Sequence, residues 1–256
     1  MELPKKSLGQ HWLSDIEALE AIAELAELKP TDTVLEIGPG LGNLTHYLAS
    51  QAARVIAVEK DEDLAAKLQD KFAAKPVQVI ADDILKFDLN ALPAGYKAVA
   101  NIPYYLTSNL LRTLSESPNP PKLMVLLVQQ EVAERLCAHP GQMSLLAVSV
   151  QLYYNCNLGL KVTADKFDPP PKVDSQVVVL HRHAKPIFAS LDTDKFFRIV
   201  KAGFSERRKK LRSSLAGGLG LSKNEVDELL SKAGINGELR AQNLSLADWH
   251  KIYQVV

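Results

Sequence analysis

Cysteine is scarce in this sequence. Cys137 and Cys156 are the only two among 256 residues, and neither has CxxC spacing or flanking histidines. The absence of these patterns excludes the common zinc sites, so we expect no bound metal. Two isolated cysteines favour a reducing compartment, so we expect a cytoplasmic protein in which both are ordinary buried residues.

Long apolar runs are also absent. A membrane-spanning helix needs about 20 consecutive apolar residues, whereas the runs here are only several residues long. We therefore expect a soluble globular protein without a membrane partner. The first ten residues, MELPKKSLGQ, contain two lysines but no apolar stretch behind them, which predicts no secretory signal.

The sequence has no net charge, because 30 Lys and Arg residues balance 30 Asp and Glu residues. Taken alone, this balance argues against a nucleic-acid partner. The charges are unevenly distributed, however. Residues 184–256 hold 13 basic and 8 acidic residues, which leaves 17 basic and 22 acidic residues for the rest. The C-terminal part is therefore basic, which the average hides.

Apolar runs typical of buried strands alternate with amphipathic helical stretches through most of the chain. The segment SDIEALEAIAELAELK begins with Ser14 and Glu17 in capping-box spacing, which predicts a helix. Nearly continuous apolar strands separated by helices predict a mostly parallel sheet that is covered on both faces. The expected strands are residues 33–37, 54–58, 77–81, 97–101 and 123–128.

Two later strand-like runs, residues 147–155 and 176–182, have no clear helix between them. They can form an antiparallel pair at one edge of the sheet.

The alternation of strands and helices ends near residue 184. Residues 187–256 show only helical patterns, and Ser222 with Glu225 forms a second capping-box pattern there. The sequence thus predicts an α/β domain over residues 1–184 and a small all-helical domain over residues 185–256.

The stretch VLEIGPGLGNLT has the pattern of a strand, a glycine-rich turn and the start of a helix. Gly38, Gly40 and Gly42 allow the backbone to approach a ligand closely. The dinucleotide fingerprint GxGxxG needs a glycine at position 43, where Asn43 stands. GxGxG is instead typical of enzymes that use S-adenosylmethionine (SAM); an ordinary tight turn is the alternative.

Acidic residues follow the next two expected strands. Ligands of such sheets bind beyond the carboxyl ends of the strands. Glu59 can accept hydrogen bonds from both ribose hydroxyls, and Asp83 can accept one from an adenine amino group, with Ile84 beside the ring. Each acidic residue alone is more often a solvated cap. A glycine turn, Glu59 and Asp83 at three consecutive strand ends are harder to attribute to chance and favour SAM as the cofactor.

The segment NIPYYLTSNLL ends the fourth expected strand. The side-chain oxygen of Asn101 and the carbonyl of Ile102, held out by Pro103, can each accept an N–H of an adenine amine and direct its lone pair at a methyl group. Tyr104 can stack on a purine that is swung out of its nucleic acid. The alternative is a proline-terminated strand with a core tyrosine. Deamination of a flipped adenine is excluded, because the HxE and PCxxC zinc motifs are absent.

Eight motifs occur in order between Lys5 and the C-terminus: KKSLGQHWL, LEIGPGLGNLT, VEKD, ADDIL, NIPYYLTS, QQEVAERL, FDPPPKVDS and RRKKLRSSL. This ordered set resembles the ribosomal RNA adenine dimethyltransferases, most closely their bacterial small-subunit branch. The resemblance implies a Rossmann-like class I SAM-dependent methyltransferase domain with a helical RNA-binding domain behind it. It also implies a monomer that transfers four methyl groups from SAM to N6 of two adjacent adenines near the 3′ end of 16S rRNA, in an immature small subunit.

The resemblance further implies roles for individual residues. Phe167 falls on the aromatic position that closes over the target base opposite Tyr104. The positions that contact the cofactor are His11, Leu13, Gly38, Gly40, Glu59, Lys60, Asp83, Ile84 and Asn101.

Two positions depart from the family pattern. Asn-Phe-Leu usually follows the dipeptide GQ, whereas this chain has His11, Trp12 and Leu13 there. The change is tolerated if the contact is made through the backbone, but cofactor affinity differs if the asparagine side chain matters. Gln242 stands where the family commonly has an acidic residue, and its role is open.

Basic residues cluster in ERRKKLR, residues 206–212. Cations on the helical domain suit contact with RNA phosphates; a solvated helix face is the alternative. Lys5 and Lys6 either extend this surface or form a mobile terminus. The expected RNA contacts are Arg207, Arg208, Lys209, Lys210 and Arg212.

Two other functions compete with small-subunit dimethylation. The first is methylation of a large-subunit rRNA adenine that confers antibiotic resistance, but EIGPG and RRKKLRSSL differ from what that branch typically has. The second is a non-catalytic RNA-binding assembly factor of the same fold. Glu59, Asp83 and the NIPY motif argue against it, because a protein without catalysis does not need them.

Overall fold

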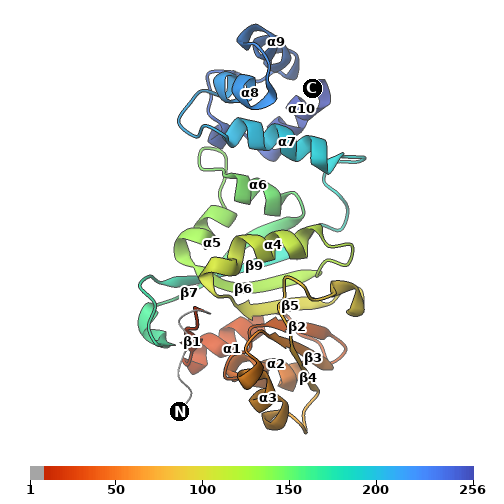
Figure 1. The fold of residues 1–256 in the computed structure, drawn as a ribbon, viewed down its shortest axis with the longest axis vertical. Helices are drawn as coiled ribbons and strands as arrows, with labels where there is room; N and C mark the ends of the chain where they lie inside the picture. The colour runs from red at the N-terminus through yellow and green to blue at the C-terminus, as the bar shows by residue number, and fades with distance from the viewer. Residues whose placement is uncertain (1–8) are drawn as a thin grey trace. The chain divides into compact units, whose positions relative to one another are not determined.

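A computed structural model of the chain describes residues 9–256; Lys5 and Lys6 lie outside the described residues. A seven-stranded sheet runs in the order β4-β3-β2-β5-β6-β9-β7 (Figure 1). Neighbours from β4 to β6 pair in parallel, whereas β9 is antiparallel to both β6 and β7. The strands are β2 (Thr33–Ile37), β3 (Arg54–Glu59), β4 (Val77–Ala81), β5 (Lys97–Asn101), β6 (Leu123–Gln129), β7 (Tyr154–Val162) and β9 (Ser175–Arg182).

This sheet confirms the predicted fold class, a mostly parallel sheet with intervening helices. The helices of this part are α1 (Ile16–Leu25), α2 (Asn43–Gln51), α3 (Glu62–Lys71), α4 (Thr107–Glu116) and α5 (Gln130–Leu136). The predicted capping box of the first helix is wrong. Its N-cap is Asp15, whose side chain accepts a hydrogen bond from Ala18 N at 3.0 Å, so the helix begins one residue later than Ser14 would place it.

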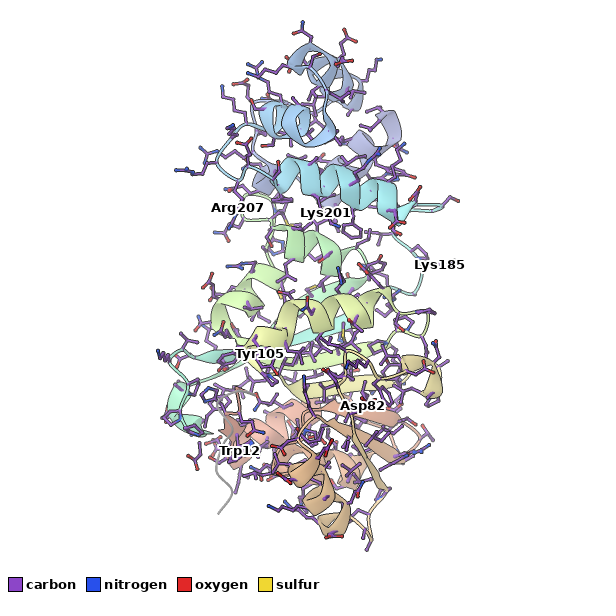
Figure 2. All side chains as sticks on the ribbon, viewed as in Figure 1. Trp12, Asp82, Tyr105, Lys185, Lys201 and Arg207 are labelled. Carbon is purple, nitrogen blue, oxygen red and sulfur yellow. The ribbon has the colours of Figure 1, made fainter. Side chains whose placement is uncertain are left out.

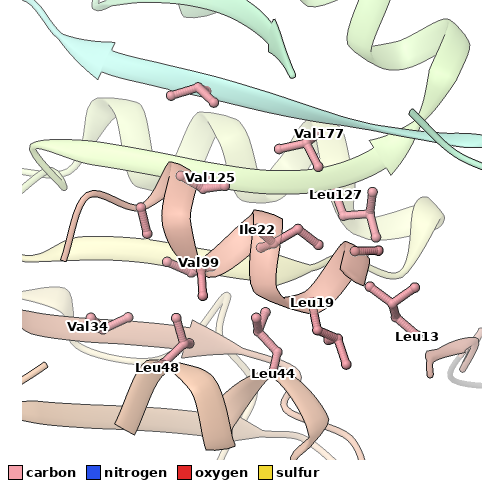
Figure 3. Packing of buried hydrophobic residues seen from close by; sticks show 14 of the residues in the cluster. Leu13, Leu19, Ile22, Val34, Leu44, Leu48, Val99, Val125, Leu127 and Val177 are labelled. Atoms are coloured by element: carbon pink, nitrogen blue, oxygen red, sulfur yellow. The ribbon is translucent and has the colours of Figure 1, made fainter. Parts of the chain in front are cut away.

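The main core lies between the sheet and helices α1 and α2. Leu19 and Ile22 of α1 belong to one core cluster with Val99 and Val125 of the central strands, and Figure 3 shows these side chains. Successive residues of a strand point to opposite faces of the sheet. Met124 and Leu126 therefore point away from α1, and they are also fully buried. Both faces of the central sheet are therefore covered, as parallel strands require.

A two-stranded antiparallel ribbon pairs segments far apart in the sequence. Its strands are β1 (Trp12–Leu13) and β8 (Phe167–Asp168). Leu13 and Phe167 both turn into the core beside α1. The ribbon thereby fixes the N-terminal segment beside the sheet.

The predicted strand at residues 147–155 is wrong over most of its length. Residues 145–151 form α6 (Leu145–Gln151), and strand β7 begins only at Tyr154. The Ser144 side chain caps this helix by accepting a hydrogen bond from Ala147 N at 3.1 Å. The cap and the burial of the apolar face outweigh the strand preference of the valines. The antiparallel pairing at the sheet edge is confirmed, but between β7 and β9.

The chain divides into two compact units. Within the described residues, the sheet unit holds 9–134 and 154–182, and the helical unit holds 135–153 and 183–256. In Figure 2 the labelled Trp12, Asp82 and Tyr105 belong to the sheet unit, and Lys185, Lys201 and Arg207 to the helical unit. The border after residue 184 stays a prediction; the units differ from it by grouping residues 135–153 with the C-terminal helices.

The helical unit packs around Trp249, which is fully buried. The predicted capping box of Ser222 and Glu225 is present. Gln242 also has a structural place, because its backbone carbonyl accepts hydrogen bonds from Gly141 N and Met143 N and its side-chain amide donates to Gly141 O. Besides α6, the helices are α7 (Thr193–Phe204), α8 (Leu211–Leu219), α9 (Lys223–Ala233) and α10 (Leu246–Val255).

The state of the two cysteines and the length of the helices bear on the expectations drawn from composition. Among residues 9–256, neither Cys137 nor Cys156 forms a disulfide, and both are half-buried instead of fully buried as expected. Burial raises the pKa of the Cys137 thiol to about 11. Among residues 9–256, no helix is both long enough and apolar enough to cross a membrane.

Two neighbouring glycines of α8 provide a test of the packing in the helical unit. A Cβ added at Gly218 would lie 2.6 Å from Ala202 Cα on α7, whereas one at Gly217 would come no nearer than 4.0 Å to Glu206 Oε1. We expect Gly218→Ala to destabilise the unit by about 1 to 3 kcal/mol through overpacking, and Gly217→Ala to stabilise it by about 0.5 to 1 kcal/mol through helix propensity. Urea unfolding of both variants measures the difference; equal midpoints would contradict the close helix contact.

Candidate active site

A pocket lies beyond the carboxyl ends of β2, β3, β4 and β5, which are neighbours or near neighbours in the sheet. It brings together most of the residues that the sequence predicts for a site. Its lining consists of Gly9, Gln10, His11, Trp12, Ile37, Gly38, Gly40, Val58, Glu59, Lys60, Asp82, Asp83, Ile84, Leu85, Asn101, Ile102, Pro103, Tyr104, Tyr105 and Leu106.

The glycine turn after β2 forms the floor of this pocket. Gly38 and Gly40 have φ angles of +64° and +58°, a region that other residues adopt at a cost. A Cβ at Gly40 would lie 2.8 Å from Trp12 Cδ1, so the turn also packs closely against the N-terminal segment. At Gly38, in contrast, a Cβ would have no neighbour within 4 Å, so a ligand can approach the backbone there.

Glu59 stands at the end of β3 with 5% of its surface exposed. Its Oε2 accepts a hydrogen bond from Gly40 N at 3.1 Å, and its Oε1 accepts one from Asp61 N at 2.9 Å. Burial raises the pKa of this carboxyl, which the two backbone donors partly offset. A carboxylate has about four acceptor positions, so each oxygen can still accept a further hydrogen bond from a ligand.

Asp83 and Lys60 form an ion pair at the next strand end. Lys60 Nζ lies 2.8 Å from Asp83 Oδ2, and Asp83 Oδ1 accepts a hydrogen bond from Leu85 N at 3.1 Å. The hydrogen bond from Lys60 lowers the pKa of Asp83. The pair holds Asp83 ionised at the mouth of the pocket, while Ile84 beside it is buried.

Asn101 ends β5 and is oriented by the N-terminal segment. Its Nδ2 donates a hydrogen bond to the carbonyl of His11 at 3.0 Å. Because a carbonyl only accepts, this contact fixes which way the amide faces and leaves Oδ1 as the acceptor. The His11 ring is held in turn, with Nδ1 2.7 Å from the carbonyl of Pro169.

Tyr104 follows Asn101 by three residues and is half-buried. Its ring stacks on the His11 ring, with centroids 6.0 Å apart and 21° between the planes. Its hydroxyl shares a hydrogen bond with Ser175 Oγ at 2.9 Å, and burial raises its pKa. Ile102 lies between these residues with its N–H donating to Leu127 O at 3.1 Å, so the turn after β5 is held at several points.

Three of the residues expected at the ligand site, Gly42, Leu13 and Phe167, do not line this pocket. A Cβ at Gly42 would lie 2.6 Å from Phe72 Cε2, so this glycine allows close packing against α3. Leu13 is buried in the core, and its carbonyl accepts a hydrogen bond from Asn43 Nδ2 at 2.9 Å. Phe167 is only 4% exposed and packs in the same core. In this structure its ring therefore does not face Tyr104 across the pocket, and the role expected for it would require it to leave the core.

Several lining residues were not predicted. Tyr105 is the most exposed of them, at 60%, and the doubled tyrosine in NIPYY was the available signal. Trp12 and Gln10 were visible as neighbours of His11. Asp82, Leu85, Ile37 and Val58 flank predicted residues in the sequence, but no pattern distinguishes them from ordinary strand-end residues.

The basic residues of the helical unit differ in their ionic partners. Residues 205–210 form the connection between α7 and α8, so most of the cluster is not a helix face. Lys209 pairs with Glu206 and Lys210 with Glu238. Arg212 Nη1 lies 3.4 Å from Asp227 Oδ2, and Arg212 Nε lies 3.6 Å from Glu238 Oε1. Among the described residues, Arg207 and Arg208 are exposed and have no acidic partner.

Sequence comparison with known proteins points to one family over nearly the whole chain. The family model described as ribosomal RNA adenine dimethylase matches residues 1–256. The "Ribosomal RNA small subunit methyltransferase A" of Dehalococcoides mccartyi (strain 195) is 45% identical over 249 residues, which cover 96% of this chain and 86% of the relative. The protein of that name from Moorella thermoacetica is 41% identical and covers 98% of this chain and 91% of its own length.

Solved structures agree with the sequence relatives. A dimethyladenosine transferase from Plasmodium falciparum superposes with a TM-score of 0.82 at 27% identity, covering 94% of this chain and 96% of its own. The 23S rRNA methyltransferase ErmE has a TM-score of 0.78 at 28% identity and covers 95% and 98%. The chain thus shares its fold, over nearly its whole length, with a dimethyladenosine transferase and a 23S rRNA methyltransferase. It belongs to the ribosomal RNA adenine dimethylase family.

Proposed function

We propose that this chain uses SAM to dimethylate N6 of two adjacent adenines near the 3′ end of small-subunit rRNA, acting as a monomer on an immature subunit in the cytoplasm. The observation that carries the proposal is the convergence of Gly38, Glu59, Asp83 and Asn101, from four strand ends, on one pocket. The membership in the adenine dimethylase family supports the reaction. The small-subunit name of relatives at 41 to 45% identity supports the substrate.

The residues present fit SAM. Glu59 has acceptor positions for two ribose hydroxyls, Asp83 can accept from the adenine amino group, and the buried Ile84 can lie against the ring. Lys60 acts indirectly, by keeping Asp83 ionised. The glycine turn leaves room for the ligand to meet backbone. Leu13 contributes through its carbonyl, which holds Asn43, the first residue of α2.

When bound, SAM supplies an electrophilic methyl group. Asn101 Oδ1 and the Ile102 carbonyl accept the two N–H groups of the target amine, which turns the nitrogen lone pair away from the ring and toward the methyl carbon. His11 fixes the Asn101 amide so that Oδ1 is the group presented. The barrier to methyl transfer is therefore lowered mainly by orientation of the reactants and by electrostatic stabilisation, and no strong base is needed.

Tyr104 provides the surface on which the target adenine stacks. Stacking on an aromatic ring is worth about 1 to 3 kcal/mol per base. Ser175 holds the hydroxyl and His11 packs against the ring, so the ring is pre-oriented. The closing role expected of Phe167 is left out of the proposal, because its side chain is in the core.

RNA binding is assigned to the cluster at residues 207–212. Arg207 and Arg208 are the strongest candidates for phosphate contacts, because the described acidic residues do not neutralise them. Lys209, Lys210 and Arg212 would first have to exchange a carboxylate for a phosphate.

Large-subunit methylation is the second candidate, because ErmE, a 23S rRNA methyltransferase, shares this fold. The higher identity to small-subunit enzymes favours the first candidate.

Transfer of labelled methyl groups tests the function. We expect the wild-type protein to label small subunits from cells that lack this gene, and N6,N6-dimethyladenosine to be the product. Large subunits from the same cells serve as the control. Labelling of large subunits alone would favour the second candidate, and no labelled adenosine in either would contradict the proposal.

Variants in the same single-turnover assay, with SAM saturating, separate base positioning from cofactor binding. Asn101→Ala should slow transfer about 10²- to 10³-fold, because it removes an acceptor of the reacting amine. Tyr104→Ala should slow it about 5- to 150-fold while SAM affinity stays the same. Tyr104→Phe keeps the ring and should lose much less. A Tyr104→Ala protein as fast as wild type would show that Tyr104 is only a core residue.

The RNA-binding assignment predicts different effects for free and paired cations. Arg207→Ala with Arg208→Ala should lower the slope of log affinity against log salt by about 1.4 to 1.8, since each phosphate contact contributes about 0.7 to 0.9. Lys209→Ala with Lys210→Ala is the control of equal charge change and should lower the slope less. Filter binding to small-subunit rRNA at several salt concentrations measures both. An unchanged slope in the arginine variant would mean that the cluster is merely solvated.

A further inference from the structure

Tyr105 lies at the rim of the strand-end pocket, next to Tyr104 in the chain. Both residues belong to the short 3₁₀ helix Tyr104–Leu106 that follows β5. Tyr104 is half-buried, whereas 60% of Tyr105 is exposed. Single exposed apolar residues are common on protein surfaces, and Ile16 is as open at 61%, but Ile16 does not line the pocket. Tyr105 thus combines an open aromatic ring with a place at the proposed reaction site.

Few contacts hold the Tyr105 side chain. Within residues 9–256 it takes part in no hydrogen bond and no ring–ring contact. A Cβ added at Gly9 would lie 3.4 Å from Tyr105 Cδ1, so part of the ring rests against the N-terminal segment. The pKa of Lys60 is raised mainly by its hydrogen bond to Asp83, and the Tyr105 hydroxyl adds to this effect. The hydroxyl therefore lies near the Lys60 ammonium, and the rest of the ring is open to solvent.

The proposed reaction takes place on two adjacent adenines, so a second base accompanies the first to the pocket. When one adenine is swung out and stacked on Tyr104, it no longer stacks on its neighbour in the RNA. That lost stacking costs free energy. The phosphodiester link keeps the neighbour within one nucleotide of the pocket mouth. Because consecutive Cα atoms are only about 3.8 Å apart, the Tyr105 ring is within reach of this neighbouring base.

We propose that Tyr105 is the stacking platform for the second of the two adenines. It first holds the adenine that waits while its neighbour is methylated on Tyr104. It then holds the finished dimethyladenine while the waiting base enters the pocket. The inference rests on the proposed function and assigns a place to the base that is not being methylated.

An aromatic ring suits both occupants of this platform. Every base has a π face, so stacking does not depend on hydrogen bonds to particular base atoms. A dimethylated N6 has lost both of its N–H donors, yet the ring of the base can stack as before. Tyr105 thereby keeps the RNA bound between the two modifications, which makes release of half-modified RNA slower than the second modification.

The products of a short reaction test this role. Small subunits from cells that lack this gene are supplied in large excess over the enzyme, with SAM saturating. Mass spectrometry of the rRNA fragment then counts molecules with one or both adenines dimethylated. The wild-type protein should yield mainly doubly modified fragments while most subunits are still unmodified. Tyr105→Ala should lower the ratio of doubly to half-modified fragments about 5- to 150-fold, the effect of losing one stacked base on the rate of release.

Two control variants make the outcome specific. Tyr105→Phe keeps the ring and should keep the wild-type ratio. Ile16→Ala removes an equally exposed apolar side chain outside the pocket and should also keep it. Calorimetry should give the same SAM affinity for Tyr105→Ala as for the wild-type protein, because the platform holds RNA and not the cofactor.

The possible failures are distinguishable. A wild-type ratio in Tyr105→Ala, or weakened SAM binding with an unchanged ratio, would overturn the platform and leave the proposed function standing. Half-modified fragments as the main early product of the wild-type protein would do the same. A wild-type protein that dimethylates neither adenine would overturn both.

Discussion

Parallel pairing of β2, β3, β4 and β5 is the constraint on which the site depends. Parallel strands bring their carboxyl ends to one edge, and the register places Ile37 beside Val58 and Glu59 beside Ala81. The residues just after each strand are then neighbours, although up to about 60 positions separate them in the sequence. A glycine turn, two acidic side chains and an amide can thus face a single ligand without any loop having to travel far.

The N-terminal segment completes the site by backbone contacts. Asn101 donates to the carbonyl of His11, and Asn43 donates to the carbonyl of Leu13. Both contacts use carbonyls, so the replacement of the usual Asn-Phe by His11 and Trp12 leaves them possible. The new side chains add what the usual pair would not: a ring against Tyr104 and an indole N–H beside the buried Glu36.

Features carried by local patterns could be predicted from the sequence, and features set by distant partners could not. The five strands β2 to β6 were predicted from their apolar runs. Glu59, Asp83 and Asn101 were predicted as site residues because each stands at or just after the end of such a run. The capping of α1 and the helix α6 were misjudged, because Asp15 and Ser144 compete with patterns that favour other boundaries. The burial of Phe167, the Lys60–Asp83 pair and the Tyr104–Ser175 hydrogen bond depend on packing between segments 23 or more residues apart. No local pattern contains that information.

A crystal structure of the protein with SAM or its demethylated product tests the central claim most directly. The account predicts one ligand in the strand-end pocket, with its ribose hydroxyls within hydrogen-bond distance of Glu59, its adenine beside Asp83 and Ile84, and its sulfur facing Asn101 and Tyr104. A ligand bound at another surface, or bound here with the adenine at Asn101 instead, would contradict the account.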